Sequence, residues 1–252
     1  MDDETTLPDV ARGREGRPRA PFVTLDGPPR EDRTRVTAVA ERARDAAVRP
    51  ERGVVIARGT RVYLRTFTRG DLGHLAAWVD DPFLERMVGS EFLHAFKHDW
   101  DKGPGFHDAV LNDATQVVLM VEARAGDWPG PVGLVRLFNI HLLEGYAFLE
   151  TIIADERAFR RGFGIEAGKL IAYYGVDVLA LRRLEAKVYE YNVLSINALR
   201  RNGFTQEGVL RQAGFQDGRY WDLVIFGILK DEIERQRSKD TTCDPGDGER
   251  VP

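Results

Sequence analysis

The 252-residue sequence predicts a mixed α/β (α+β) fold, in which a mostly antiparallel, twisted sheet is flanked by helices. Runs rich in β-branched residues are separated by short turns, which predicts sequential hairpins and disfavours an all-parallel sheet. Other segments repeat apolar residues every three or four positions, which predicts helices that each bury one face. A hydrophobic content of 43% is sufficient for one sizeable core, so a single folded domain at 53–235 is expected.

The first half of this domain alternates strand and helix and then becomes helical. Asp81 and Pro82 end the first predicted helix, and the segment 103–105 interrupts the helical stretch that follows. The segment 126–130 has the composition of a turn between two strands, which predicts a hairpin. The predicted elements are a strand at 62–67, a helix at 71–79, helical pieces over 83–115, and strands at 116–122 and 132–140.

The second half continues with a strand, a long helix and a closing hairpin. A long apolar face begins at position 164, and Gln216, Asp217 and Gly218 are typical of a turn between two strands. The predicted elements are strands at 146–153 and 185–191, helices at 164–179 and 195–201, and strands at 209–215 and 220–229.

Both ends of the chain differ from the domain in composition. Residues 1–52 begin with many Pro, Gly, Arg and Asp residues, which predicts a disordered extension with one short helix between Thr34 and Pro50. Residues 236–252 follow a frayed helix end and lead into Gly, Asp and Pro, which predicts a flexible tail.

Charge and cysteine content exclude several classes of protein. A formal net charge of −4 gives no general attraction to nucleic acid. Cys243 is the single cysteine, so disulfides and cysteine-rich zinc sites are not expected. This low cysteine content is typical of proteins in a reducing cytoplasm. The acidic start Met1–Glu4 precedes no apolar segment, and no apolar run reaches the roughly 18 residues of a membrane span. We therefore expect a soluble cytoplasmic protein.

One sequence motif indicates an anion-binding site, at the junction between the strand 146–153 and the long helix. The segment 156–164 ends in Arg-Arg-Gly-Phe-Gly, in which glycines let main-chain amides approach a ligand and the helix start attracts an anion. Ala167 breaks the dinucleotide-binding glycine pattern, and no Gly-Lys-Ser/Thr run follows, so Rossmann and P-loop sites are disfavoured. Taken alone, the segment is equally compatible with a simple turn.

Three further pieces accompany this motif in the sequence. The four pieces are Val62–Arg65 with Asp71, Arg160–Ala167, Asn192 with Ser195 and Asn202–Phe204, and Glu207–Arg211 with Asp217–Tyr220. Together they resemble the GNAT acetyltransferases, in particular the branch of the ribosomal-protein Nα-acetyltransferases (the RimJ/RimL type) and related polyamine and amino-sugar acetyltransferases. The resemblance covers about 59–232 and implies the GNAT fold, with a sheet splayed at the strand pair that binds CoA.

The resemblance implies acetyl-CoA as the cosubstrate. Amides from about Arg160 to Ile165 would bind the pyrophosphate, and the pantetheine arm would pair with the splayed strand like an extra strand. Phe159 departs from the Arg or Gln usual in the family, and Arg157 or Arg161 is expected to compensate. The residues expected to bind the cosubstrate are Ile152, Ile153, Arg157, Arg160, Arg161, Gly162, Phe163, Gly164, Ile165, Asn192 and Ser195.

The expected catalytic groups follow the same resemblance. Many GNAT enzymes protonate the departing thiolate with a Tyr, and Leu199 stands at that position. Ser195 is the alternative acid, and it also suits the N-cap of a helix that begins at Ile196. Neutralising a lysine-like amine near pH 7.4 costs about 4 kcal/mol, so a base is useful. Gly214 replaces a candidate base, and Glu150 is expected to act instead.

Two weaker candidate bases are Asp222 and His141, and for each carboxylate a salt-bridged surface role is the alternative. His94 and His98 share a predicted helix face without the Glu of a zinc protease motif, so no metal site is expected. We predict acetyl transfer to a primary amine of a small molecule. Protein N-terminal acetylation and non-catalytic acyl-CoA binding are the alternatives, and a homodimer is possible because dimers are common in the family.

Overall fold

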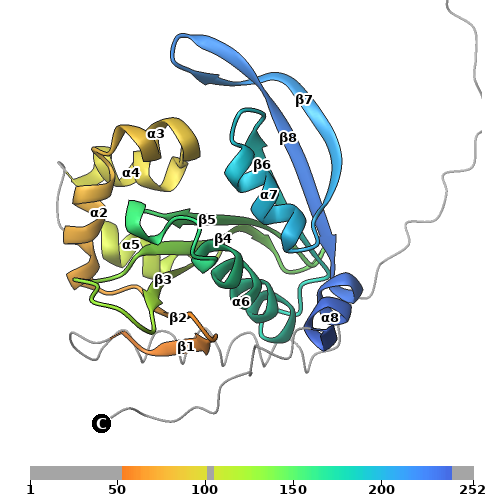
Figure 1. The fold of residues 1–252 in the computed structure, drawn as a ribbon, viewed down its shortest axis with the longest axis horizontal. Helices are drawn as coiled ribbons and strands as arrows, with labels where there is room; N and C mark the ends of the chain where they lie inside the picture. The colour runs from red at the N-terminus through yellow and green to blue at the C-terminus, as the bar shows by residue number, and fades with distance from the viewer. Residues whose placement is uncertain (1–52, 101–104, 240–252) are drawn as a thin grey trace, which may run out of the picture.

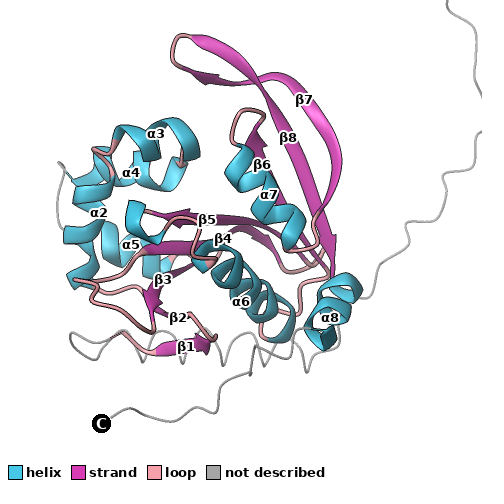
Figure 2. Cartoon of the chain, viewed as in Figure 1, coloured by secondary structure: helices cyan, strands magenta, loops and turns pink. Residues whose placement is uncertain are grey.

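The computed structural model describes residues 53–100 and 105–239. The predicted N-terminal extension, Cys243 and most of the predicted tail lie outside the described residues. Within the described residues, one eight-stranded sheet carries helices on both faces, as Figures 1 and 2 show. None of the helices described is long and apolar enough to cross a membrane.

The strands are β1 Val55–Arg58, β2 Val62–Thr66, β3 Val117–Ala123, β4 Gly133–His141, β5 Tyr146–Ile153, β6 Arg183–Tyr189, β7 Thr205–Gln216 and β8 Arg219–Leu229. The helices are α2 Leu72–Trp78, α3 Pro82–Val88, α4 Glu91–Trp100, α5 Phe106–Asn112, α6 Phe163–Asp177, α7 Val193–Arg201 and α8 Lys230–Lys239. Two short 3₁₀ turns, η1 Arg69–Asp71 and η2 Glu156–Ala158, precede α2 and the loop before α6.

The sheet has the strand order β1-β2-β3-β4-β5-β6-β8-β7 and is antiparallel except between β5 and β6. The parallel pairing of β5 with β6 spans Tyr146–Phe148 and Arg183–Glu185. Both strands continue beyond this pairing, to Ile153 and Tyr189, and so diverge. The predicted splay is confirmed, and it opens at the carboxyl ends of the two strands, where α6 begins.

Side-chain alternation along the strands divides the apolar residues between two cores. One core lies under α6 and α7 and includes Leu119, Val135 and Leu149. The other lies under α2–α5 and includes Met120 and Ile152. The splayed ends of β5 and β6 are therefore reached from two different faces of the sheet.

A buried ion pair fixes the connection between β2 and α2. Nη1 and Nη2 of Arg65 donate to Asp71, at 2.7 Å each, and Nε donates to Glu122 of β3 at 2.9 Å. Asp71 is 2% exposed and also accepts from the amide and hydroxyl of Thr68. This network explains why the sequence pairs Arg65 with Asp71.

The structure differs from the sequence predictions mainly at element ends. β1 was not predicted, and β7 begins at Thr205 and contains two irregularities in its pairing. α7 begins at Val193 because Asn192, not Ser195, caps it, so the predicted N-cap role of Ser195 is wrong. α8 continues to Lys239, beyond the predicted boundary at 235.

Candidate functional site

The loop between β5 and α6 has the backbone geometry of an anion-binding site. Arg160 and Gly162 have positive φ values of 60° and 82°, and such conformations in a non-glycine residue gather at functional sites. Within the described chain, no protein acceptor lies at the amides of Gly162, Phe163, Gly164 and Ile165. These amides occupy the positive end of the α6 dipole, where a phosphate group would bind.

A buried carboxylate holds the start of α6 against the turn between β1 and β2. Oε1 of Glu166 accepts from the amide and the hydroxyl of Thr60, both at 2.7 Å. Oε2 accepts from the amides of Arg61 and Val62, at 2.8 and 3.0 Å. A Cβ at Gly59 would lie within 3.0 Å of this carboxylate, so the turn requires glycine there. Sequence reasoning missed this contact, because its partners lie more than 100 positions apart.

Four arginines bring positive charge to the loop. Nη1 of Arg61 donates to the carbonyl oxygen of Arg161 at 3.4 Å, a contribution from the β1–β2 turn that the sequence did not reveal. Arg157 forms an ion pair with Asp155 at 2.6 Å. Arg160 is exposed and forms no ion pair with any described residue. Arg61 and Arg160 are thus the arginines with the most freedom to meet a phosphate.

Aromatic side chains brace the loop on both sides. Trp128, from the β3–β4 loop, lies 5.1 Å from the guanidinium of Arg157 and 5.7 Å from that of Arg161. Phe159 packs against Phe83 of α3, with ring centroids 5.1 Å apart. The departure from the family pattern at Phe159 therefore joins the loop to α3.

The end of β5 packs closely against the start of α6. A Cβ at Gly164 would lie 3.1 Å from Cγ1 of Ile153, so the glycine allows the helix to approach the strand closely. Ile152 points to the opposite face and is fully buried in the α2–α5 core. Because β5 leaves β6 after Phe148, its main chain from there to Ile153 borders the splay. An extended ligand could pair with this edge, as predicted.

Asn192 has a structural role that the sequence analysis did not predict, and its predicted contact with the cosubstrate stays a prediction. Its side chain is 4% exposed, and Oδ1 accepts from the amide of Ser195 at 3.0 Å. Nδ2 donates to the carbonyl oxygen of Met87 in α3 at 2.7 Å. Both polar groups of Asn192 are therefore engaged within the protein. Ser195 lies in the first turn of α7, and its hydroxyl has no partner among the described residues.

Glu150 lies on the α2–α5 face of the splayed strand and is held by two neighbours. Arg136 is its cross-strand partner in β4, and Nε donates to Oε2 of Glu150 at 2.5 Å. The hydroxyl of Ser90, at the start of α4, donates to the same oxygen at 3.1 Å. Guanidinium stacking on Phe138, at 4.1 Å, fixes Arg136 further. Glu150 is thus both salt-bridged and adjacent to the splay.

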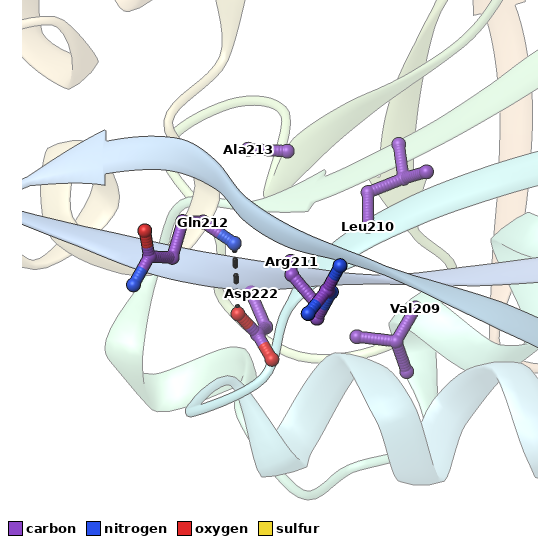
Figure 3. Close-up of a pocket in the computed structure, with 6 residues that line it drawn as sticks. All are labelled: Val209, Leu210, Arg211, Gln212, Ala213 and Asp222. Carbon is purple, nitrogen blue, oxygen red and sulfur yellow. Dashed lines mark hydrogen bonds between the residues drawn. The ribbon is translucent and has the colours of Figure 1, made fainter.

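Asp222 and His141, the two weaker candidate bases, each contact another residue of the protein. Oδ1 of Asp222 accepts from the amide of Gln212 at 2.8 Å, which closes a bulge in β7 where Gln212 has a φ of 52°. Figure 3 shows this contact among the residues that line a pocket, 209–213 and Asp222. The pocket is open to solvent and has a volume of about 860 Å³. His141 stacks on Tyr146, with ring centroids 4.9 Å apart, at the closed end of the β5–β6 pair and away from the splay.

Packing explains the residues found at Leu199 and Gly214, the two positions at which a family acid or base was expected. Leu199 is 7% exposed and belongs to the core under α6 and α7. Gly214 is buried, and a Cβ there would lie within 3.0 Å of the Tyr189 ring. A Glu at 214 would therefore require Tyr189 to move. Sequence reasoning missed Tyr189, although a glycine inside a predicted strand is a signal of a close contact.

The two histidines of α4 form a pair on the surface. The rings of His94 and His98 are 4.3 Å apart, and both residues are exposed. Over residues 53–100 and 105–239, no group of three or more His, Cys, Asp or Glu side chains is arranged to hold a metal ion.

Comparisons with known proteins agree with this geometry. Spermidine N(1)-acetyltransferase of Escherichia coli (strain K12) is 28% identical over 169 residues, which cover 67% of this chain and 86% of that protein. The crystal structure of spermidine N-acetyltransferase from Vibrio cholerae in complex with CoA and spermine matches with a TM-score of 0.56 and 22% identity, over 69% of this chain and 98% of that one. This second likeness shows the fold alone.

Two findings show the family. The "Uncharacterized N-acetyltransferase YoaA" of Bacillus subtilis (strain 168) is 38% identical over 180 residues, which cover 68% of this chain and 94% of that protein. A family model described as "Acetyltransferase (GNAT) domain" matches residues 61–205, more than half of the chain. The chain therefore belongs to the GNAT acetyltransferase family, and it is an N-acetyltransferase with acetyl-CoA as its cosubstrate.

Proposed function

We propose that this enzyme transfers the acetyl group of acetyl-CoA directly to a primary amine of a small molecule, with the cosubstrate held at the β5–α6 loop. The observation that carries the proposal is the row of amides from Gly162 to Ile165, which have no protein acceptor in the described chain and lie at the open end of the splay. A pyrophosphate supplies the acceptor oxygens that these amides lack. Arg160 and Arg61 add charge at the same place.

The splay lets donor and acceptor approach from opposite faces. With the pyrophosphate at the start of α6, the pantetheine arm would lie along the free edge of β5 as an added strand. The amine would then arrive from the α3–α4 face, where Glu150 lies. Its nitrogen would bond to the thioester carbon, the carbon–sulfur bond would break, and the thiolate would take up a proton.

Proton transfer is the part of the reaction for which the chain must supply side chains. We propose Ser195 as the donor to the thiolate, supported by a hydroxyl that no described residue engages. We propose Glu150 as the group that receives the amine proton, directly or through water. Oε1 of Glu150 accepts no hydrogen bond in the described chain, whereas Oε2 is held by Arg136 and Ser90.

A small-molecule acceptor is favoured over a protein N-terminus. The spermidine acetyltransferases among the relatives act on a small amine, as their names state. The RimJ/RimL resemblance favours a protein acceptor, but the base associated with that branch would stand at Gly214, against the Tyr189 ring. A protein acceptor would appear as an acetylated N-terminus in mass spectrometry of peptides incubated with the enzyme.

The cosubstrate site is tested by thermal unfolding with acetyl-CoA. At about 100 times its Kd, acetyl-CoA should stabilise the wild type by about 2.7 kcal/mol, or about 5–10 °C in Tm. Gly162→Glu should abolish this shift, because the new side chain meets Arg61 and brings negative charge to the phosphate site. Gly218→Glu is the matched control, since Gly218 also has a positive φ, of 76°, but nothing within 4 Å of its Cβ.

The two outcomes separate clearly. A shift in the wild type and in Gly218→Glu, but not in Gly162→Glu, supports the cosubstrate site. No shift with any acyl-CoA in the wild type would mean that the loop is only a turn. Release of free CoA with a panel of polyamines, amino sugars, amino acids and peptides then tests the acceptor class.

We also propose a cytoplasmic location, supported by the single cysteine of the sequence. A homodimer stays a prediction, and light scattering of the purified chain would measure it directly.

A further inference from the structure

The junction between α3 and α4 spans the splay on the face opposite α6. Gly89 ends α3 in a left-handed conformation, with a φ of 56°, and Ser90 follows it. A Cβ at Gly89 would lie 2.9 Å from the ring of Tyr189, the last residue of β6. The Ser90 hydroxyl donates to Glu150 of β5. Adjacent residues of one turn thus contact both diverging strands.

The end of α3 is fixed in this position from the β6–α7 connection. The hydroxyl of Tyr191 donates to the carbonyl oxygen of Arg86 at 2.6 Å, and Asn192 donates to that of Met87 at 2.7 Å. Arg86 also forms an ion pair with Asp217 in the turn of the β7–β8 hairpin. Figure 1 shows the tip of this hairpin bending toward α3. The face opposite α6 is thereby walled by α3 and the hairpin.

The ring of Tyr189 fills the slot between these two walls. It lies between Gly89 and Gly214, because a Cβ at either position would come within 3.0 Å of the ring. It also stacks on Tyr191, with centroids 5.2 Å apart and planes 14° apart. Tyr189 remains half-buried, so one part of the ring borders solvent. Two glycines from distant segments leave room for one aromatic ring. The ring is therefore the side chain at this place that a substitution can remove.

We propose that Tyr189 is a specificity-determining residue that limits the bulk of the acceptor next to its amine. The inference rests on the proposed function, in which the acceptor must approach the splay from the face opposite α6. At that face, the Tyr189 ring lies against Gly89 of the α3–α4 junction on one side and Gly214 of the hairpin on the other, and its remaining edge borders solvent. An amine on an unbranched carbon can pass the ring edge, whereas a branched or cyclic carbon beside the nitrogen collides with it.

The test compares kcat/KM for an unbranched primary alkylamine and for its isomer branched at the carbon beside nitrogen. Tyr189→Ala should reduce the preference for the unbranched amine by about tenfold or more, the scale of one extra methylene in a tight pocket. Tyr189→Phe keeps the ring and should keep the preference. The KM for acetyl-CoA should stay within about twofold of the wild type in both variants, because the donor occupies the other face.

A second pair of variants removes the ambiguity of a folding defect. Gly214→Ala should displace the ring and lower kcat/KM for the unbranched amine by about tenfold. Gly208→Ala is the matched control in the same strand, where nothing lies within 4 Å of the added Cβ. In the double variant with Tyr189→Ala, the Gly214→Ala loss should disappear, because the ring it displaces is absent.

The proposal is overturned if the preference for the unbranched amine is unchanged in Tyr189→Ala, or if the Gly214→Ala loss persists in the double variant. Failure of the wild type to acetylate any amine, with acetyl-CoA still raising its Tm, would instead contradict the proposed function. The two failures are therefore distinguishable.

Discussion

Replacing Glu166 by Ala removes the carboxylate that joins α6 to the β1–β2 turn. The amide of Val62, a fully buried residue, would lose its acceptor, which costs about 1–3 kcal/mol. Thr60 and Arg61 are exposed, so water can replace the carboxylate at their amides, at about 0.5–1.5 kcal/mol each. The expected loss is about 2–6 kcal/mol, a large part of the total of about 5–15 kcal/mol for a domain.

Thermal unfolding without ligand measures this loss. For a domain of this size the loss corresponds to a Tm lower by about 4–24 °C. Glu166→Gln keeps one acceptor oxygen and should fall between the wild type and Glu166→Ala. Glu156→Ala removes the same charge from an exposed position in η2 and is the control. If Glu166→Ala and Glu156→Ala unfold at the same temperature, the reasoning about the buried carboxylate is wrong.

Three further predictions test other parts of the site and its support. Burial opposes ionisation of Asp71, but the hydrogen bonds and charge of Arg65 outweigh it and lower the pKa. The stability that this carboxylate contributes is therefore present above its unfolded pKa of about 3.9 and is lost as pH falls through the lower folded pKa. Asp71→Asn should lower the free energy of unfolding by about 3–5 kcal/mol at pH 7, and by less at pH 3, as measured by urea unfolding. Asn192→Asp keeps the cap on α7 but places a carboxylate oxygen against the Met87 carbonyl oxygen, so Tm should fall and the KM for the amine should rise. A change confined to the KM for acetyl-CoA would instead indicate that Asn192 contacts the pantetheine arm. Ser195→Ala should lower kcat by about 100-fold if its hydroxyl protonates the thiolate, with acetyl-CoA binding retained, and an unchanged kcat would remove Ser195 from the mechanism.

The sequence alone was sufficient for the mixed sheet and for the loop between β5 and α6, at which we propose that the cosubstrate binds. Strand alternation, helical spacing and glycine placement are local properties, and they identified β5, α6 and the loop between them because each depends on residues close together in the chain. The splay followed from the family resemblance, and the pairing of β5 with β6 confirms it. β1 escaped notice because a strand of four residues carries too little alternation to stand out.

Only the tertiary structure decided which partner each candidate side chain has. Asn192 ties α7 to α3 and Glu150 is paired with Arg136, and neither role is readable from the residues around them in the chain. Glu166 and Tyr189 escaped notice for the same reason, since their partners lie on distant segments. A side chain's hydrogen bonds and free space depend on what the fold brings beside it. Local pattern therefore predicted the loop at which we propose that the chemistry occurs, and long-range packing decided which side chains near it already have a partner within the protein.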